Sequence, residues 1–179
     1  GDKYLYNGSY SASLWDRAYN NYVKDLVNLL VITDPSIEGQ EDLVNYHAMA
    51  RILKVLAFHR LTDHYGDVPY SEAGKGYLER IFFPKYDAQQ DIYFDMLKEL
   101  DEAGDQLSAT AQNPEGQDLF YGGDIAKWKK FANSLMLRLG MRMTKVAAND
   151  AQTWVELALS KGVMENFDDN CFIRHTDGP

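Results

Sequence analysis

LVNYHAMARILKVLAFHRLTDHYG, residues 43–66, is the stretch of sequence that decides the fold of this chain. Its apolar side chains recur at intervals of three or four residues, at Leu43, Tyr46, Ala50, Leu53, Ala57 and Leu61. That interval places them on one face of an α-helix. Gly66 follows, and glycine readily adopts the left-handed conformation with which many helices end. The stretch therefore predicts one long helix of roughly 25 residues.

Four further segments carry the same spacing and are also predicted to be helical. They span residues 15–29, 92–107, 125–146 and 150–161. Pro35 follows the first segment and Gly162 the last, and both residue types commonly mark helix ends. Asp87 and Gln90, before the second segment, match a capping box, in which two side chains bond the free amides of a helix start. Asp124 is placed to cap the third segment.

Charge suggests how two of these helices pair. Residues 87–107 contain seven acidic residues and one lysine, whereas residues 125–146 contain six basic residues and no acidic one. Opposite charges along the seam would favour antiparallel pairing of these two helices. Each exposed ion pair contributes only ~0 to 1 kcal/mol, so the buried apolar stripes supply the stability. The alternative is that both charged faces are simply solvated and never meet.

Helix pairs in series predict an all-α fold of stacked antiparallel helix pairs, a degenerate tetratricopeptide-like solenoid, in one domain over residues 1–179. A strict 34-residue period is absent, because the predicted helix starts are unevenly spaced. Two long loops, residues 67–86 and 108–123, exceed the roughly 12 to 15 residues above which loops are usually functional or mobile. We expect contacts with partners there. Residues 171–174 are too few to assign, although they could form a strand whose partner lies outside this chain.

Composition narrows the classes of partner. The net charge of −9 argues against nucleic acid and against anionic membranes, because binding phosphates requires a basic face. Cys171 is the single cysteine, so the chain forms no disulfide within itself. The longest apolar run lies within residues 26–32, far short of the ~20 residues that span a bilayer.

The sequence contains no recognisable catalytic motif. Nucleophile elbows, Walker loops, HExxH and CxxC patterns are all missing. His59 and Asp63 have a spacing at which they could share a metal ion, but no third ligand is evident. The acidic side chains at positions 87, 91, 95 and 99 repeat along one polar helix face, where solvation explains them. We therefore predict no catalytic residue, no metal and no cofactor.

Three blocks of sequence carry a family resemblance. The first is ARILKVLAFHRLTDHYGDVPYSEA, residues 50–73, in which Tyr65-Gly66-Asp67-Val68-Pro69-Tyr70 is the most specific part. The second comprises residues 86–87, 91–93 and 100–103, and the third comprises residues 122–124 and 127–135. In this order and spacing they resemble the SusD/RagB family of outer-membrane nutrient-binding lipoproteins.

The resemblance implies a non-enzymatic protein at the cell surface. Such a protein captures a glycan or another oligomeric nutrient and passes it to a SusC-like TonB-dependent transporter. Contact with the outer membrane would be through a lipid anchor that is absent from this chain. Family members are longer, so the chain resembles the helical part of a longer protein. The alternative function is a helical-repeat adaptor that binds a peptide or protein partner.

The resemblance carries few ligand contacts to this sequence. Tyr4, Tyr6 and Tyr10 precede the first predicted helix and could form part of an aromatic platform for a sugar. The alternative is that they belong to a frayed terminus whose rings pack on the core. Trp15 and Trp128 lie on apolar helix faces and are predicted to be core residues.

The motif loop is predicted to be structural. It comprises Tyr65, Gly66, Asp67, Val68, Pro69 and Tyr70. Pro69 fixes one backbone dihedral, and Asp67 is placed to bond the backbone after Gly66. These residues are therefore expected to shape the turn that follows the long helix.

Overall fold

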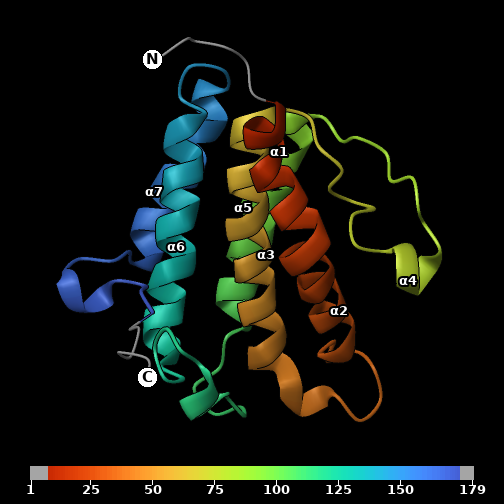
Figure 1. Cartoon of the computed structure of the whole chain (residues 1–179). Coiled ribbons are helices and arrows are strands. Elements are labelled where there is room, and N and C mark those ends of the chain that lie inside the picture. Colours follow the sequence, from red (N-terminus) through yellow and green to blue (C-terminus); the bar gives the residue numbers. More distant parts are fainter. Residues whose placement is uncertain (1–7, 174–179) are drawn as a thin grey trace, which may run out of the picture.

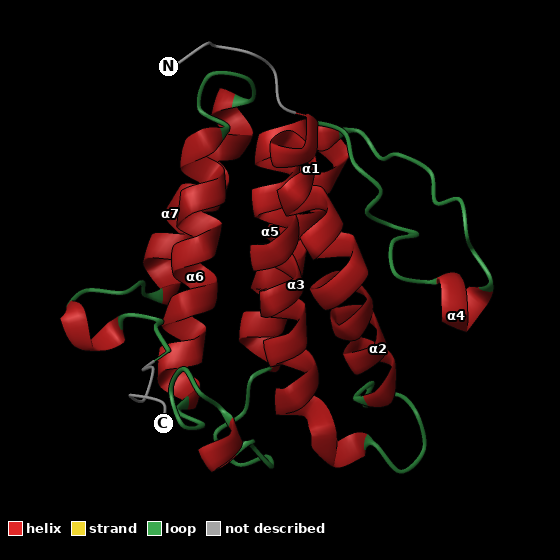
Figure 2. Ribbon diagram, viewed as in Figure 1, coloured by secondary structure: helices red, strands yellow, loops and turns green. Residues whose placement is uncertain are grey.

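The computed structural model describes residues 8–173, which fold into helices joined by loops (Figure 1). The α-helices are Gly8–Arg17 (α1), Lys24–Ile32 (α2), Val44–Tyr65 (α3), Gly76–Glu79 (α4), Gln89–Gln106 (α5), Ile125–Arg142 (α6) and Ala148–Lys161 (α7). A π-helix, Ala18–Val23, joins α1 to α2, and short 3-10 turns occupy Glu41–Leu43, Glu115–Gln117 and Phe167–Asp169. Residues 8–173 contain no strand beyond one isolated bridge between Val68 and Asp87, so the predicted all-α class is confirmed (Figure 2).

The helix ends follow the local signals in most places. The predicted N-cap Asp124 accepts a hydrogen bond from Lys127 N at 3.1 Å, and Gly162 ends α7 with φ at +89°. The first helix begins at Gly8, earlier than the spacing from Trp15 indicated. Residues 171–173 are irregular, and the rest of the segment considered for a strand lies outside the described residues.

Each long helix packs antiparallel against the next one along the chain, in the order α2, α3, α5, α6 and α7. Asn45 at the start of α3 bonds the backbone of Ser108, just after α5, whereas Asp63 near the end of α3 bonds Tyr93 near the start of α5. Arg142 at the end of α6 also bonds Tyr93, so α6 reverses direction again. This serial packing is the predicted stack of antiparallel helix pairs.

The core lies between α3, α5 and α6. Its largest fully buried side chains include Ile52, Phe58, Leu61, Ile92, Met96, Leu100, Trp128, Met136 and Leu139. The outer helices contribute less, since α2 has no buried residue and α7 has only Ala151 and Ala158. Gly140 allows α7 to approach α6 closely, because a Cβ at this position would lie 3.0 Å from Val155 Cγ2.

The predicted antiparallel pairing of α5 with α6 is confirmed, but the predicted charge seam between them is wrong. In the described part of the chain no ion pair joins these two helices. The acidic residues of α5 pair elsewhere, Glu99 and Glu102 with Arg51 on α3, and Asp101 and Asp105 with Lys161 at the end of α7. These carboxylates lie on the flanks of α5, where long basic side chains of other helices reach them.

Candidate functional site

The motif loop turns the chain sharply at the end of α3. Gly66 has φ at +75° and ψ at −123°, a combination that side chains strongly disfavour. Thr62 Oγ1 donates to Gly66 O at 2.7 Å and closes the turn. Val68, Pro69 and Tyr70 are buried behind it. Half of the motif's six residues are thus buried in the protein interior.

Two aspartates fasten the ends of the loop, although not in the predicted arrangement. The capping box of Asp87 and Gln90 is wrong, because Asp87 Oδ2 accepts from the backbone amides of Tyr70 (3.1 Å) and Ser71 (2.7 Å) instead. Partial burial alone would raise the pKa of Asp87, but these hydrogen bonds hold it below its ordinary value. The first backbone amide of α5 finds its hydrogen-bond acceptor in the motif loop, because Gln89 N donates to Asp67 Oδ1 at 2.8 Å. The loop therefore connects α3 to α5 directly.

Tyr65 fastens the same loop to α1. Its hydroxyl donates to Ser11 O at 2.6 Å and accepts from Trp15 N at 3.2 Å. Those two groups are the partners of one i→i−4 helical hydrogen bond, and a group inserted there distorts a helix. The π-helix Ala18–Val23 begins three residues later. Sequence periodicity did not predict this insertion, because it depends on a residue 50 positions away.

An aromatic cluster lies where α1 meets this loop. The ring of Trp15 stacks on that of Tyr86, with centroids 6.0 Å apart and planes at 23°. Tyr65 meets Trp15 edge-on at 5.3 Å. Both Trp15 and Trp128 are predicted to be core residues. Trp128, which is 2% exposed, confirms this prediction, whereas Trp15 is only half-buried. Tyr86 presents an exposed ring at the surface of this cluster.

Of the three tyrosines predicted to contact ligand, only Tyr10 falls within the described residues. It lies on α1 with 81% of its surface exposed. Tyr4 and Tyr6 lie outside the described residues.

The candidate metal pair has other partners. His59 Nε2 lies 3.0 Å from Asp63 Oδ2 but is poorly oriented to hydrogen-bond it. Asp63 also pairs with Arg142 at 2.8 Å and accepts from Tyr93 Oη at 2.5 Å. Burial is the main cause that lowers the pKa of His59, so its ring is neutral near pH 7. Among residues 8–173 no group of three potential ligands is suited to a metal ion.

A groove of about 730 Å³ lies beside this network. It is formed by the end of α3, the start of α5 and the turn between α6 and α7. Met141 and Val146 are exposed apolar residues on its rim, and Gln90 contributes a polar side chain. The groove offers few rings, and its floor is the ion-paired network described above.

A second cavity, of about 580 Å³, is richer in aromatic side chains. We call it the aromatic hollow, and it is lined by residues 119–121, Lys127 and residues of the segment 167–173. Phe120, Tyr121, Phe167 and Phe172 supply rings, and Phe167 is 78% exposed. Its volume lies within the roughly 300 to 1,000 Å³ of small-molecule sites.

Asp118 holds one wall of the aromatic hollow. Its carboxylate accepts hydrogen bonds from the backbone amides of Phe120 (2.9 Å), Tyr121 (3.3 Å) and Gly123 (2.9 Å). It also accepts from the indole Nε1 of the buried Trp128 at 2.7 Å. A single side chain therefore ties the turn to the core.

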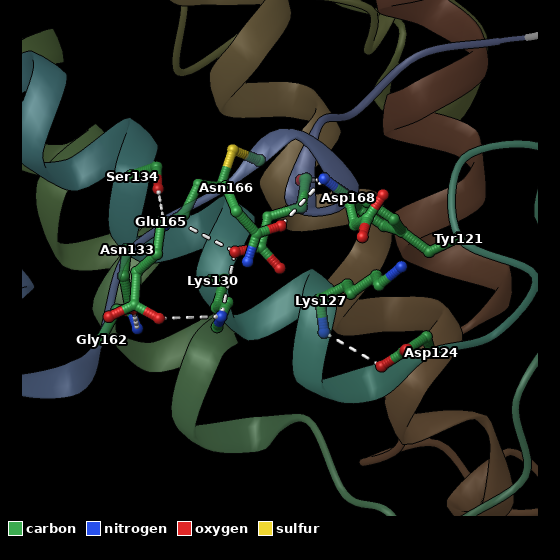
Figure 3. A network of polar contacts seen from close by, with 12 residues as sticks. Tyr121, Asp124, Lys127, Lys130, Asn133, Ser134, Gly162, Glu165, Asn166 and Asp168 are labelled. Carbon is green, nitrogen blue, oxygen red and sulfur yellow. Dashed lines mark hydrogen bonds and ion pairs between the residues drawn. The ribbon is translucent and has the colours of Figure 1, made fainter.

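Asp169 holds the opposite wall through Glu165 and Lys130, two residues that are labelled in Figure 3. Its carboxylate accepts from Glu165 N at 2.9 Å and pairs with Lys130 at 3.0 Å, and both contacts hold the pKa of Asp169 below its ordinary value. Tyr121 Oη donates to Asp169 O at 2.9 Å and so joins the two walls. The length of the loop 108–123 predicts contacts there, but no signal in the sequence places residues 167–173 beside it.

Known proteins share both this sequence and this fold. A family described as "Starch-binding associating with outer membrane", SusD-like, matches residues 1–179. A solved chitin-binding protein is 43% identical, with a TM-score of 0.85 over 94% of this chain and 35% of its own. A SusD-like protein from Bacteroidetes is 34% identical, with a TM-score of 0.85 over 96% of this chain and 31% of its own. A chitin-binding SusD homologue from Flavobacterium johnsoniae is 33% identical, with a TM-score of 0.76 over 89% of this chain and 33% of its own.

The chain spans about a third of the length of these solved relatives. No curated protein matched it. None of the helices described within residues 8–173 combines the length and apolar character needed to cross a membrane. The family match extends over the whole chain, and the solved relatives share its stacked helices at identities above 30%. The chain therefore belongs to the SusD-like family of starch-binding proteins that associate with the outer membrane.

Proposed function

We propose that the intact protein binds a glycan at the cell surface and delivers it to a SusC-like TonB-dependent transporter. The observation that carries this proposal is the family match over the whole chain, because that family is described as starch-binding. Two of the solved relatives are named as chitin-binding, one of them at 43% identity. We therefore favour chitin-type oligosaccharides, which are neutral chains of N-acetylated sugars, over starch.

In this proposal the protein binds its glycan without cleaving it and needs no cofactor. A lipid anchor holds the protein at the cell surface, and the helices serve as scaffold and as docking surface for the transporter. Tyr4, Tyr6 and Tyr10 contribute rings to the glycan contact. Tyr10 is exposed and lies on the same helix as Trp15, whose ring stacks on that of Tyr86, which supports this assignment.

Calorimetric titration of the intact protein with chitin oligosaccharides and with malto-oligosaccharides of equal length tests the proposal. We expect saturable binding of the first and weaker binding of the second. Binding to a peptide library with no response to either glycan would instead favour a helical-repeat adaptor. A reducing-sugar assay checks the absence of cleavage, and new reducing ends would refute a purely binding role. Co-purification of a TonB-dependent transporter with the tagged protein tests the delivery step.

A further inference from the structure

We infer that the aromatic hollow is a saccharide subsite that holds one neutral sugar ring of the bound glycan. The inference rests on the proposed glycan-binding function and adds a place on this chain. The first observation that supports it is the aromatic lining of the hollow. Four rings line the hollow, and one of these residues, Phe167, is 78% exposed. Aromatic side chains carry a large apolar surface that packs well against the C–H face of a sugar.

The second support is the set of polar side chains in the hollow. Lys127, Asp168 and Asn170 line it, and none of these side chains has a hydrogen bond or ion pair within residues 8–173. By contrast, Lys130 and Asp169, their neighbours in the sequence, are paired with each other. In Figure 3 the side chain of Lys127 extends away from the Lys130 network, toward Tyr121 and Asp168. The hollow thus keeps both donors and acceptors for a ligand.

These groups select a hydroxylated, uncharged ligand. An ammonium donates hydrogen bonds, a carboxylate accepts them, and an amide does both. Hydroxyl groups also do both, so a sugar can satisfy all three side chains. An anionic ligand would meet the carboxylate of Asp168 in a chain whose net charge is −9, which favours a neutral saccharide over a phosphorylated or sulfated one.

The walls of the hollow are held before any ligand arrives. Asp118 fixes the turn that carries Phe120 and Tyr121, and Asp169 fixes the turn that carries Phe167. Groups that are already ordered lose little conformational entropy on binding, which favours affinity.

The test is titration of the intact protein with a chitin oligosaccharide, using Phe167→Ala and Lys127→Ala. Leu159→Ala is the matched control, because Leu159 is also an exposed apolar residue, at 54%, but lies on α7, outside the hollow and both long loops. Removing a phenyl group that packs on the ligand should weaken binding about ten- to hundredfold. Losing one hydrogen-bonding group should weaken it several-fold, and the control should bind as the wild type does.

The outcomes separate the two proposals. If the wild type binds glycan and both hollow variants bind equally well, the subsite is refuted while the proposed function stands. If Phe167→Ala lowers the melting temperature but leaves affinity unchanged, Phe167 packs against protein and the subsite is likewise refuted. If the wild type binds no glycan at all, the proposed function is refuted, and the subsite that rests on it is refuted as well. Weakened binding in Lys127→Ala with an unchanged melting temperature would support the subsite.

Discussion

Replacing Asp118 with alanine would remove the acceptor that ties the turn 118–123 to the core. Four donors lose their partner at once, namely the amides of Phe120, Tyr121 and Gly123 and the indole N–H of Trp128. Trp128 is 2% exposed, so its N–H cannot turn to water without moving the helix. We therefore expect the whole turn to open more easily.

The expected magnitude follows from these four bonds. A buried donor left without a partner costs about 1 to 3 kcal/mol, and each lost amide bond about 0.5 to 1.5 kcal/mol, less where water replaces the acceptor. The four terms sum to about 2.5 to 7.5 kcal/mol, and replacement of the acceptor by water at the amides narrows the expected cost to about 3 to 5 kcal/mol, or an opening equilibrium raised about 150- to 4,500-fold. Asp118→Asn should lose most of this as well, because its amide NH₂ would face donors that both carboxylate oxygens now serve.

Hydrogen exchange of the peptide covering residues 118–128 measures this opening in the intact protein. Asp124→Ala is the matched control, since it removes a single N-cap bond from the same segment and should cost only ~1 kcal/mol. Exchange in Asp118→Ala that is no faster than in Asp124→Ala would refute the reasoning, because it would mean that Asp118 does not hold the turn.

Three further changes test the packing of the helices. Gly140→Val places a branched side chain where even a Cβ lies 3.0 Å from a side chain of α7. We therefore expect the free energy of unfolding, measured by chemical denaturation, to fall by about 1 to 3 kcal/mol. Unchanged stability would contradict the close approach of the two helices. Arg51 holds the pKa of Glu102 below its ordinary value. This ion pair therefore stabilises the fold fully above the unfolded-state pKa of about 4.3. The stabilisation is lost as the pH falls through the lower pKa of the folded state. Arg51→Met should therefore lower the melting temperature at pH 7, and this loss should shrink as the pH is lowered below about 4.3. A loss that does not change with pH would argue against the pair. Tyr65→Phe deletes the hydroxyl inserted into α1 but allows the helical hydrogen bond between Trp15 N and Ser11 O to form. We expect a loss of only ~1 kcal/mol in the free energy of unfolding and NMR chemical shifts that move from π-helical toward α-helical values. An unchanged π-helix would refute the inserted hydroxyl as its cause.

The motif loop has a physical explanation that does not involve a ligand. Its residues form hydrogen bonds to three helices. Tyr65 bonds α1, and Asp67 and the hydroxyl of Tyr70 bond α5, the latter at Asp95. Pro69 O accepts from Tyr19 Oη of the π-helix. Gly66 supplies the turn that points them there. The loop thus sets the positions of neighbouring helices, which supports the structural role that the sequence predicts for it.

The helices themselves follow from the sequence alone. The apolar spacing in residues 43–66 predicts α3 almost to its ends, and Asp124 predicts the start of α6 correctly. Both signals act within one or two helical turns, where each residue meets partners only three or four positions away. No knowledge of the fold is needed to read them.

The tertiary structure alone decided which polar groups meet. Asp87 was expected to cap its own helix, yet it bonds residues 16 and 17 positions earlier. The acidic residues of α5 were expected to face α6, yet Arg51 reaches Glu99 from 48 positions away. The aromatic hollow joins Tyr121 to a segment 48 positions later. Such contacts depend on how the helices cross and how the loops return, and neither periodicity nor net charge records that geometry.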